Sequence, residues 1–529
     1  MFFTRYYLLF ASLFVGVNCL KILFIVPQFG PSHVKMMGAA ADILAKKHDV
    51  TYFIPPVDIS LNKTGTLLSH VITTEKSDVF IPLQGDKMAF QRNIWVEDML
   101  SNKFFTRMIN MVKKNAVANC DRLIKNETLT AYMKVQKFDI AIGETFLYCS
   151  FVLMKMYGIK QHVAISANPL MISKYFGITN SPAQVPEITT VATDLEMGFF
   201  NRLRNVWSFY MGNVFVDEVI DGEQEVIDRK FGKGVYDIRQ EIRDSAFVVT
   251  NNDPLVNFQY STLPKVLHLG GMTITPTQPL SLELEGAMSK KEKVILISFG
   301  SVAQGMHIPL PIKIILLEVI KSMPDVMFLF KYEDDEDTLV KGIDNLYTSK
   351  WLPQSDLLNH KRLSGFYTHG GISSLLEAAR FGKPIVVTPL FSDQFKNSKI
   401  ASKLGFGYTL YKSDLTDAAK VKAAFNLLLD ENNDLAVSAH RLSSMIQNRP
   451  GNLTDIFIKH VEFAAKYGKL PFLNMEGHNM SIFTYALLDI ISFVLACGLL
   501  IVGLIVYLIR KLYCSLLGEI YDSHDKKKK

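Results

Sequence analysis

Short apolar runs alternate with segments of helical length along most of the chain. In the first half, residues 22–26 form an apolar, β-branched run of strand length, and residues 50–54 and 138–142 repeat that pattern. Residues 27–33 connect the first strand to a helical stretch at 34–47. Strands that alternate with helices of this length predict right-handed βαβ units and a parallel sheet.

The second half repeats the alternation more regularly. Its predicted strands are residues 294–299, 326–330, 365–368 and 384–387, and its predicted helices are residues 311–323, 374–381 and 393–404. Between the halves, residues 272–293 contain two prolines and a Lys-Lys-Glu-Lys run, which favour a linker. We therefore expect an α/β fold with two doubly wound domains that face a cleft, because ligands bind at the carboxyl ends of parallel strands.

The first residues have the pattern of a targeting segment. Arg5 precedes twelve uncharged residues, and small residues follow near Cys19. Twelve apolar residues are too few to span a bilayer. The pattern therefore favours a secretory signal peptide at residues 1–19 over an anchor or a first buried strand.

Near the other end, residues 490–509 contain no Asp, Glu, Lys or Arg. Twenty helical residues extend about 30 Å, which is the thickness of the hydrocarbon core of a bilayer. Arg510 and Lys511 follow directly, so the positive-inside rule places residues 510–529 in the cytosol. We expect a single-pass type I membrane protein with a lumenal body.

Charge and cysteine content restrict what that body can do. The net charge of +6 comes mostly from the two end segments, and a nearly neutral body lacks the basic surface that nucleic-acid binding requires. Only Cys120 and Cys149 lie within the body. One disulfide can form, but the body is not a disulfide scaffold.

Two kinds of motif fit a body in the lumen of the endoplasmic reticulum. N-glycosylation sequons begin at Asn62, Asn126, Asn452 and Asn479, all on the lumenal side. The terminal lysines 526–529 resemble the dilysine retrieval signal of reticulum membrane proteins. A stop-transfer flank or a lipid-binding patch is the alternative interpretation of these lysines.

Polar residues with glycines follow a predicted strand of the second half. Thr368-His369-Gly370-Gly371 leads to Ser373, Ser374 and Glu377 on the next helix. Glycines let a backbone approach a phosphate closely, and the N–H groups at a helix start can bind it. The alternative is that Ser374-Leu-Leu-Glu377 is a capping box that only stabilises a helix start.

Further residues continue the pattern on both sides, and together they resemble the signature of the UDP-glycosyltransferase family. The matching runs are FYTHGGISSLLE at 366–377, PIVVTP at 384–389 and Asp393-Gln394, with Trp351-Leu-Pro-Gln354 before them. The animal membrane-bound branch is the closest likeness, and it extends over nearly the whole chain. It implies a GT-B fold of two Rossmann-like domains: an acceptor-binding domain at 20–271 and a UDP-sugar-binding domain, with a trailing segment, at 294–489.

The resemblance also implies donor contacts in the second half. Trp351 would stack on the uracil, Gln354 would contact the nucleoside, and Glu377 would bind the ribose. His369 would face the pyrophosphate beside Gly371, Ser373 and Ser374, and Gly300-Ser301 would form a second phosphate loop. Asp393 and Gln394 would bind the sugar. Many relatives have Asn in place of Ser373.

The first half supplies a candidate general base. His33 follows the first strand and begins the next helix, whose positive end disfavours imidazolium, so the ring should be neutral and able to accept a proton. An ordinary turn histidine is the alternative. The resemblance identifies His33 as the catalytic base and implies Glu144 as its carboxylate partner, at a position where mammalian relatives usually have Asp.

We expect inverting transfer of a glucuronosyl or glucosyl group from a UDP-sugar to a hydroxyl of a small lipophilic acceptor, without a cofactor or metal. The protein can also form homo-oligomers, or hetero-oligomers with related transferases. The second hypothesis is a catalytically silent relative that binds lipophiles or partner transferases. A third, a metal-dependent transferase, rests only on the acidic run 333–337, which otherwise predicts a solvated loop.

An apolar stripe at helical spacing lies in the first half, at Phe199, Phe200, Leu203, Trp207, Tyr210 and Met211. We expect it to face the core. A helix that lies in the membrane surface beside the acceptor site is the alternative.

Overall fold

The computed structural model describes residues 19–526 except Ile59, 78–79, 99–100, 168–172, 177–181 and 188–196. The chain forms two units, Met1–Asn474 and Met475–Lys529. Residues 1–18 of the predicted signal peptide lie outside the described residues, and so do the last three lysines.

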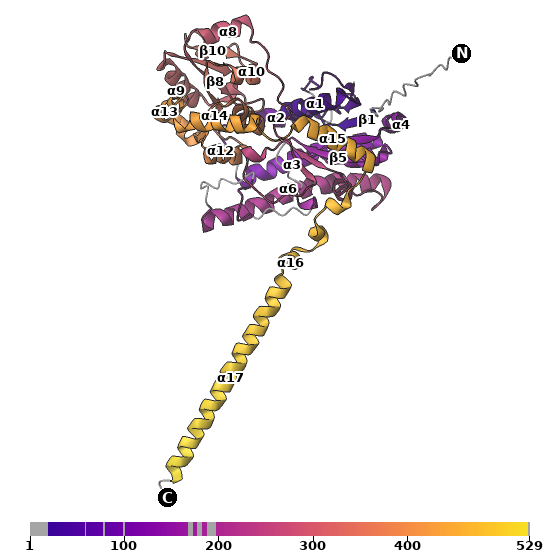
Figure 1. The fold of residues 1–529 in the computed structure, drawn as a ribbon, viewed down its shortest axis with the longest axis vertical. Coiled ribbons are helices and arrows are strands. Elements are labelled where there is room, and N and C mark those ends of the chain that lie inside the picture. Colours follow the sequence, from indigo (N-terminus) through magenta and orange to yellow (C-terminus); the bar gives the residue numbers. More distant parts are fainter. Residues whose placement is uncertain are drawn as a thin grey trace, which may run out of the picture. The chain divides into compact units, whose positions relative to one another are not determined.

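Seven parallel strands form the sheet of the N-terminal half of the first unit, in the order β3-β2-β1-β4-β5-β6-β7 (Figure 1). They are β1 (Lys21–Ile25), β2 (Asp49–Phe53), β3 (His70–Ile72), β4 (Ile140–Glu144), β5 (His162–Ser166), β6 (Val248–Thr250) and β7 (Val266–His268). The helices of this half are α1 (Pro31–Ala45), α2 (Ile81–Asn93), α3 (Asn102–Lys125), α4 (Glu127–Gln136), α5 (Cys149–Met156), α6 (Phe199–Phe231) and α7 (Ile238–Arg243).

Six parallel strands form the second sheet, in the order β10-β9-β8-β11-β12-β13. They are β8 (Lys293–Ser298), β9 (Val326–Lys331), β10 (Leu346–Ser349), β11 (Leu363–Thr368), β12 (Ile385–Val387) and β13 (Gly407–Thr409). The helices that follow the N-terminal half are α8 (Leu282–Ser289), α9 (Leu310–Lys321), α10 (Gln354–Asn359), α11 (Ile372–Phe381), α12 (Gln394–Lys403), α13 (Ala418–Leu427), α14 (Asp434–Gln447) and α15 (Leu453–Tyr467).

The central strands are apolar throughout because helices cover both faces of each sheet. In β1, Leu23 and Ile25 enter one buried cluster and Ile22 and Phe24 enter another. Strand β8 divides its residues between two clusters in the same way. Two parallel α/β sheets were predicted from these continuous apolar runs, and the structure contains both.

The segment expected as a linker is partly helical. Helix α8 occupies its second half, and Leu284 and Met288 pack into a core cluster of the C-terminal sheet. The charged run 290–293 follows the end of this helix and leads into β8, and the irregular connection between the halves ends by residue 281. Helix α15 then returns to the N-terminal half, where Phe457 joins the cluster of Ile22 and Phe24 (Figure 1).

The expectation that the apolar stripe at 199–211 faces the core is wrong for most of its length. Phe199, Phe200 and Trp207 are 66%, 74% and 53% exposed, and only Met211 packs against the core cluster. The one buried residue in these turns is polar: Asn205 bonds to the backbone of 182–187. The beginning of α6 thus contacts a loop through an amide and leaves its apolar side chains exposed.

Cys120 of α3 and Cys149 at the start of α5 form a disulfide. It joins two helices that pack on the same core cluster of the N-terminal sheet.

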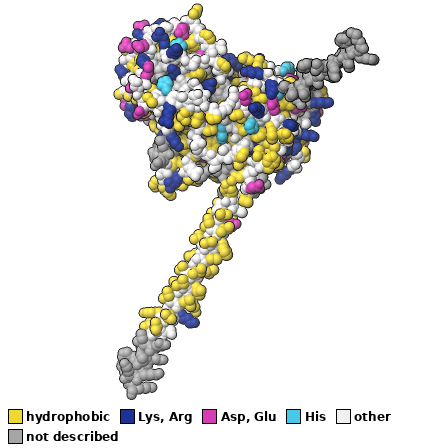
Figure 2. Space-filling model, viewed as in Figure 1, with side chains coloured by type: hydrophobic (Ala, Val, Ile, Leu, Met, Phe, Trp, Pro, Cys, Tyr) yellow, Lys and Arg dark blue, Asp and Glu magenta, His cyan; other side chains and the backbone are white. Residues whose placement is uncertain are grey.

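The second unit is dominated by α17 (Leu488–Lys526), which follows the short helix α16 (Ile482–Tyr485). Its residues Leu488–Gly518 are long and apolar enough to cross a membrane by length and composition. Hydrophobic side chains cover this helix in the space-filling view (Figure 2). The span predicted at 490–509 lies within it.

Candidate active site

A cavity of about 700 Å³ lies between the two halves of the first unit. This volume is within the usual range for a small-molecule site. Its lining includes the predicted His33, Gly300, Ser301, Trp351, Gln354, His369, Gly371, Ser373, Ser374, Glu377, Asp393 and Gln394. The structure therefore brings these residues together from segments that are up to 361 positions apart.

His33 lies in the first turn of α1, and Glu144 is the last residue of β4. The His33 Nδ1 atom is 3.1 Å from Glu144 Oε1, and Glu144 Oε2 accepts a hydrogen bond from the Phe146 N–H at 3.0 Å. A carboxylate accepts hydrogen bonds, so this contact favours the tautomer of His33 with a proton on Nδ1, in which Nε2 is the acceptor nitrogen. The Phe146 ring packs edge-on against the imidazole and fixes its orientation further.

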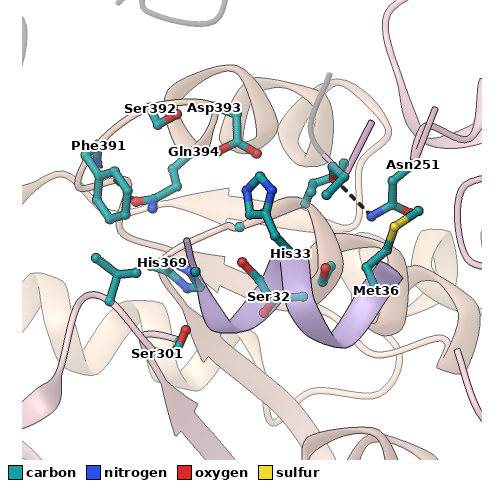
Figure 3. Close-up of a pocket in the computed structure, with 18 of the residues that line it drawn as sticks. Ser32, His33, Met36, Asn251, Ser301, His369, Phe391, Ser392, Asp393 and Gln394 are labelled. Atoms are coloured by element: carbon teal, nitrogen blue, oxygen red, sulfur yellow. Dashed lines mark hydrogen bonds between the residues drawn. The ribbon is translucent and has the colours of Figure 1, made fainter. Parts of the chain in front are cut away.

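Figure 3 shows the His33 ring pointing from α1 toward Asp393 and Gln394 of the C-terminal half. The Asp393 carboxylate accepts hydrogen bonds from Asn397 Nδ2 at 2.7 Å and from the Ile372 N–H, yet burial raises its pKa. Gln394 Oε1 accepts hydrogen bonds from the N–H groups of Leu390 and Phe391. The Gln394 side-chain carbonyl thus accepts hydrogen bonds from the loop at 390–391, and its NH₂ group is the part that can bind a ligand.

The His369 ring lies between two glycine backbones. A Cβ atom on Gly300 would be 2.7 Å from the ring, and one on Gly371 would be 2.8 Å from it. Gly300 also has a φ of +82°, which favours glycine. Burial, aided by the nearby charge of Lys331, lowers the pKa of His369 to about 3. His369 is therefore a neutral hydrogen-bonding group at physiological pH.

Glu377 does not belong to a capping box. Helix α11 begins at Ile372 with Gly371 as its N-cap, so Ser374 lies inside the helix and caps nothing. The Glu377 carboxylate instead accepts a hydrogen bond from Gln354 Nε2 at 2.6 Å and lies 3.7 Å from Lys35 Nζ of the other half. The capping-box alternative is wrong, and the carboxylate faces the cavity.

Trp351 is 61% exposed at the end of the cavity. The Lys63 ammonium lies 4.8 Å from its ring centroid, a cation–π distance. The exposed Trp351 ring therefore lines the cavity where the two halves meet, with a cation over one of its faces.

Two parts of the site were not found from the sequence. The first is Lys331, which ends β9 and whose Nζ bonds to Gly300 O at 2.9 Å and to Glu333 Oε1 at 2.5 Å. It directly follows the predicted strand 326–330, so the rule that ligands bind at carboxyl ends of strands could have found it.

The second part is the apolar end of the cavity. It is lined by aromatic and methionine side chains of α2, α3, α6 and the β4–α5 loop: Phe90, Phe104, Phe105, Met108, Met111, Phe146 and Phe209. The amphipathic pattern of the long α3 predicts a buried face but does not tell a core from a cavity wall.

Three carboxylates of the acidic run 333–337 form close pairs with lysines. Glu333 pairs with Lys331, Asp335 with Lys350, and Asp337 with Lys313. Over the residues that the structure describes, no group of three or more His, Cys, Asp or Glu side chains is placed to hold a metal ion.

Comparison with known proteins gives concordant results. Residues 21–521 match the family model described as UDP-glucoronosyl and UDP-glucosyl transferase. Caenorhabditis elegans ugt-47, provisionally named a UDP-glucuronosyltransferase, is 30% identical, with 96% of each chain covered. The 2-hydroxyacylsphingosine 1-beta-galactosyltransferase of Mus musculus is 25% identical, with 99% of this chain and 94% of that protein covered.

Solved structures share the fold. Medicago truncatula UGT71G1, complexed with UDP-glucose, has a TM-score of 0.55 at 17% identity and covers 85% of this chain and 99% of its own. TcCGT1, in complex with UDP, has a TM-score of 0.54 at 13% identity and covers 85% and 100%. The chain shares the GT-B fold of these glycosyltransferases and has its two parallel sheets.

Proposed function

Because the chain belongs to the family of UDP-glucuronosyl and UDP-glucosyl transferases, we propose that it transfers a glucuronosyl or glucosyl group from a UDP-sugar to a hydroxyl of a small lipophilic acceptor, with inversion at the anomeric carbon. The UDP-sugar is a co-substrate, and the reaction uses no cofactor or metal ion. The observation that carries the proposal is the His33–Glu144 pair, since His33 lines a cavity that has polar groups at one end and aromatic groups at the other.

In this mechanism His33 Nε2 takes the proton of the acceptor hydroxyl while its oxygen attacks the anomeric carbon from the face opposite UDP. The new carbon–oxygen bond forms as the bond to the β-phosphate oxygen breaks, and UDP leaves with the electron pair. Glu144 holds the proton on Nδ1 and stabilises the imidazolium that results. The 3.1 Å contact of Nδ1 with a carboxylate supports this assignment, because it leaves Nε2 as the ring nitrogen for the acceptor proton.

The donor would lie along the C-terminal half. Trp351 stacks on the uracil, Gln354 and Glu377 bind the nucleoside and its ribose, and Asp393 and Gln394 bind the sugar. The N–H groups at the start of α11, near Gly371, Ser373 and Ser374, meet the diphosphate together with the Gly300-Ser301 loop and the neutral His369. The support for this arrangement is that all of these residues line one cavity.

The direct test is turnover by the full-length protein in detergent. It would be incubated with a panel of UDP-sugars and a mixed library of phenols and steroids, and the products read by mass. Glycosylated products from one or more UDP-sugars are expected. Binding of UDP without any product across the panel would favour the catalytically silent relative instead.

Replacing Glu377 with alanine should weaken UDP binding by about 10- to 100-fold. Hydrogen bonds to charged groups contribute about 1.5–3 kcal/mol each, and the ribose hydroxyls would lose theirs. Calorimetric titration of UDP measures the effect. Stability should change little, because Gln354 Nε2 keeps its bond to Ser374 Oγ.

The matched control is Glu318→Ala, an exposed glutamate on α9. It should leave the UDP affinity unchanged. An unaltered UDP affinity in Glu377→Ala, alongside a lowered melting temperature, would show that Glu377 has only a structural role.

We also propose that the protein lies in the endoplasmic reticulum membrane, with its body in the lumen and its tail in the cytosol. In support, Arg510 and Lys511 flank the apolar part of α17 predicted to span the membrane, and the sequon residues Asn62 and Asn452 are exposed. Protease added to sealed microsomes should then remove only an epitope on the tail. Digestion of the body would overturn this topology.

A double variant, Lys526→Ser with Lys527→Ser, tests the retrieval signal. If these lysines are such a signal, the variant protein should leave the endoplasmic reticulum.

A further inference from the structure

Lys331 is a buried ammonium group at the edge of the cavity where the donor diphosphate is expected. It is the last residue of β9, and β8, its neighbour in the sheet, leads directly into Gly300-Ser301. The residue is 9% exposed and lines the cavity. A buried charge requires partners, and the proposed mechanism has so far given this one no role.

Its two bonds point to a defined task. The Nζ atom donates to Gly300 O at 2.9 Å and to Glu333 Oε1 at 2.5 Å. The carboxylate of Glu333 thus fixes the ammonium, and the ammonium fixes the carbonyl of the Gly300–Ser301 peptide. A lysine that served only to neutralise Glu333 would not need the second bond.

Fixing that carbonyl also fixes the neighbouring N–H. In a trans peptide the C=O and the following N–H point in opposite directions, so holding Gly300 O orients the Ser301 N–H. Cis peptides are absent from the described part of the chain. Among the described residues, the Ser301 N–H has no hydrogen-bond partner.

A carbonyl turned toward a phosphate would repel it, whereas an N–H would bind it. The Gly300 φ of +82° lets the loop turn at this point, and the adjacent His369 ring leaves no room for a side chain there. Lys331 is thus the side chain that holds the carbonyl of this peptide, while Ser298 Oγ accepts from the preceding N–H of Gly300 at 3.5 Å.

We propose that Lys331 is a positioning residue of the donor site, which holds the Gly300 carbonyl so that the Ser301 N–H binds the diphosphate. This inference rests on the proposed function, because it assumes a UDP-sugar in the cavity. Glu333 acts through Lys331 by fixing its ammonium group. The acidic run thus contributes to the site through a lysine.

The test compares ligands with and without phosphates on the full-length protein. The affinities of UDP, UMP and uridine are measured by calorimetry for wild type, K331M and K331R. K331M should weaken UDP binding by about tenfold or more, since it removes a charge-assisted hydrogen bond that orients the loop, while uridine affinity changes less than about twofold. K331R keeps a donor for both partners and should restore UDP affinity to within about threefold of wild type.

Two further variants serve as controls, one for impaired folding and one for the loss of a lysine outside the cavity. K331M leaves the half-buried Glu333 carboxylate without its cation and can impair folding. The double variant K331M/E333Q removes both charges together and should show the same selective loss of UDP affinity. K341M removes a lysine that pairs with Glu336 of the same run outside the cavity lining, and it should change nothing.

The outcomes separate the two proposals. Equal losses for UDP and uridine in K331M and in the double variant, or no loss for either ligand, would overturn the role of Lys331 alone. Failure of the wild-type protein to bind any of the three ligands would contradict the proposed function, and the role of Lys331 with it.

Discussion

Replacing His33 with alanine is expected to lower the rate of transfer by about 10²- to 10⁴-fold, the usual contribution of a positioned general base. An alcohol or phenol is a poor nucleophile until its proton is being removed, and no other described imidazole is in contact with Glu144. UDP affinity should not change, because the proposed donor contacts lie in the other half of the unit. The measurements are kcat for the best acceptor and calorimetric titration of UDP.

The matched control is His70→Ala, since His70 is an exposed histidine on β3 of the same sheet. It should transfer at the wild-type rate. Normal turnover by His33→Ala would refute His33 as the base, although a UDP-sugar site could still exist.

Replacing Glu144 with glutamine should also lower turnover strongly, by up to about 10⁴-fold, with little change in the apparent affinity for either substrate. The amide has nearly the same shape and can still reach the imidazole. It cannot stabilise the imidazolium formed on proton transfer, nor does it enforce the tautomer with the proton on Nδ1. The split between kcat and KM, measured with a saturating donor, tests this.

Glu144→Asp is the informative companion variant, because it keeps the charge and shortens the arm. It should retain more activity than Glu144→Gln, since a carboxylate still accepts the Nδ1 proton. Equal transfer by wild type and Glu144→Gln would remove Glu144 from the mechanism and leave His33 oriented by Phe146 and the helix start.

The strands were predictable because they are buried on both sides. An apolar run such as 294–299 leaves a parallel strand as its simplest interpretation, and β8 begins and ends within one residue of it. The same reasoning failed at 199–211. A stripe at helical spacing shows which side of α6 is apolar, but not whether another element covers it.

Some residues of the candidate site could be identified from the sequence, and the role of others could not. Glycines, the histidine and the acidic residues of 366–394 are local in sequence, so a linear pattern identified them together. Glu377 was ambiguous between a cap and a ligand contact, because both uses fit the same spacing. Only the position of Gly371 as the N-cap and the bond from Gln354 decide between them.

The sequence by itself determined the two parallel sheets, the apolar span and the family signature, because periodicity and motif spacing are properties of neighbouring positions. Only the tertiary structure shows three features: the distance between His33 and Glu144, the apolar wall of the cavity, and the bond from Lys331 to Gly300. The two contacts join residues that are 111 and 31 positions apart in the sequence. The apolar wall is formed by helix faces whose pattern would be the same if they lined a core. Their geometry is set by how strands order in a sheet and how two halves face each other, which no local pattern encodes.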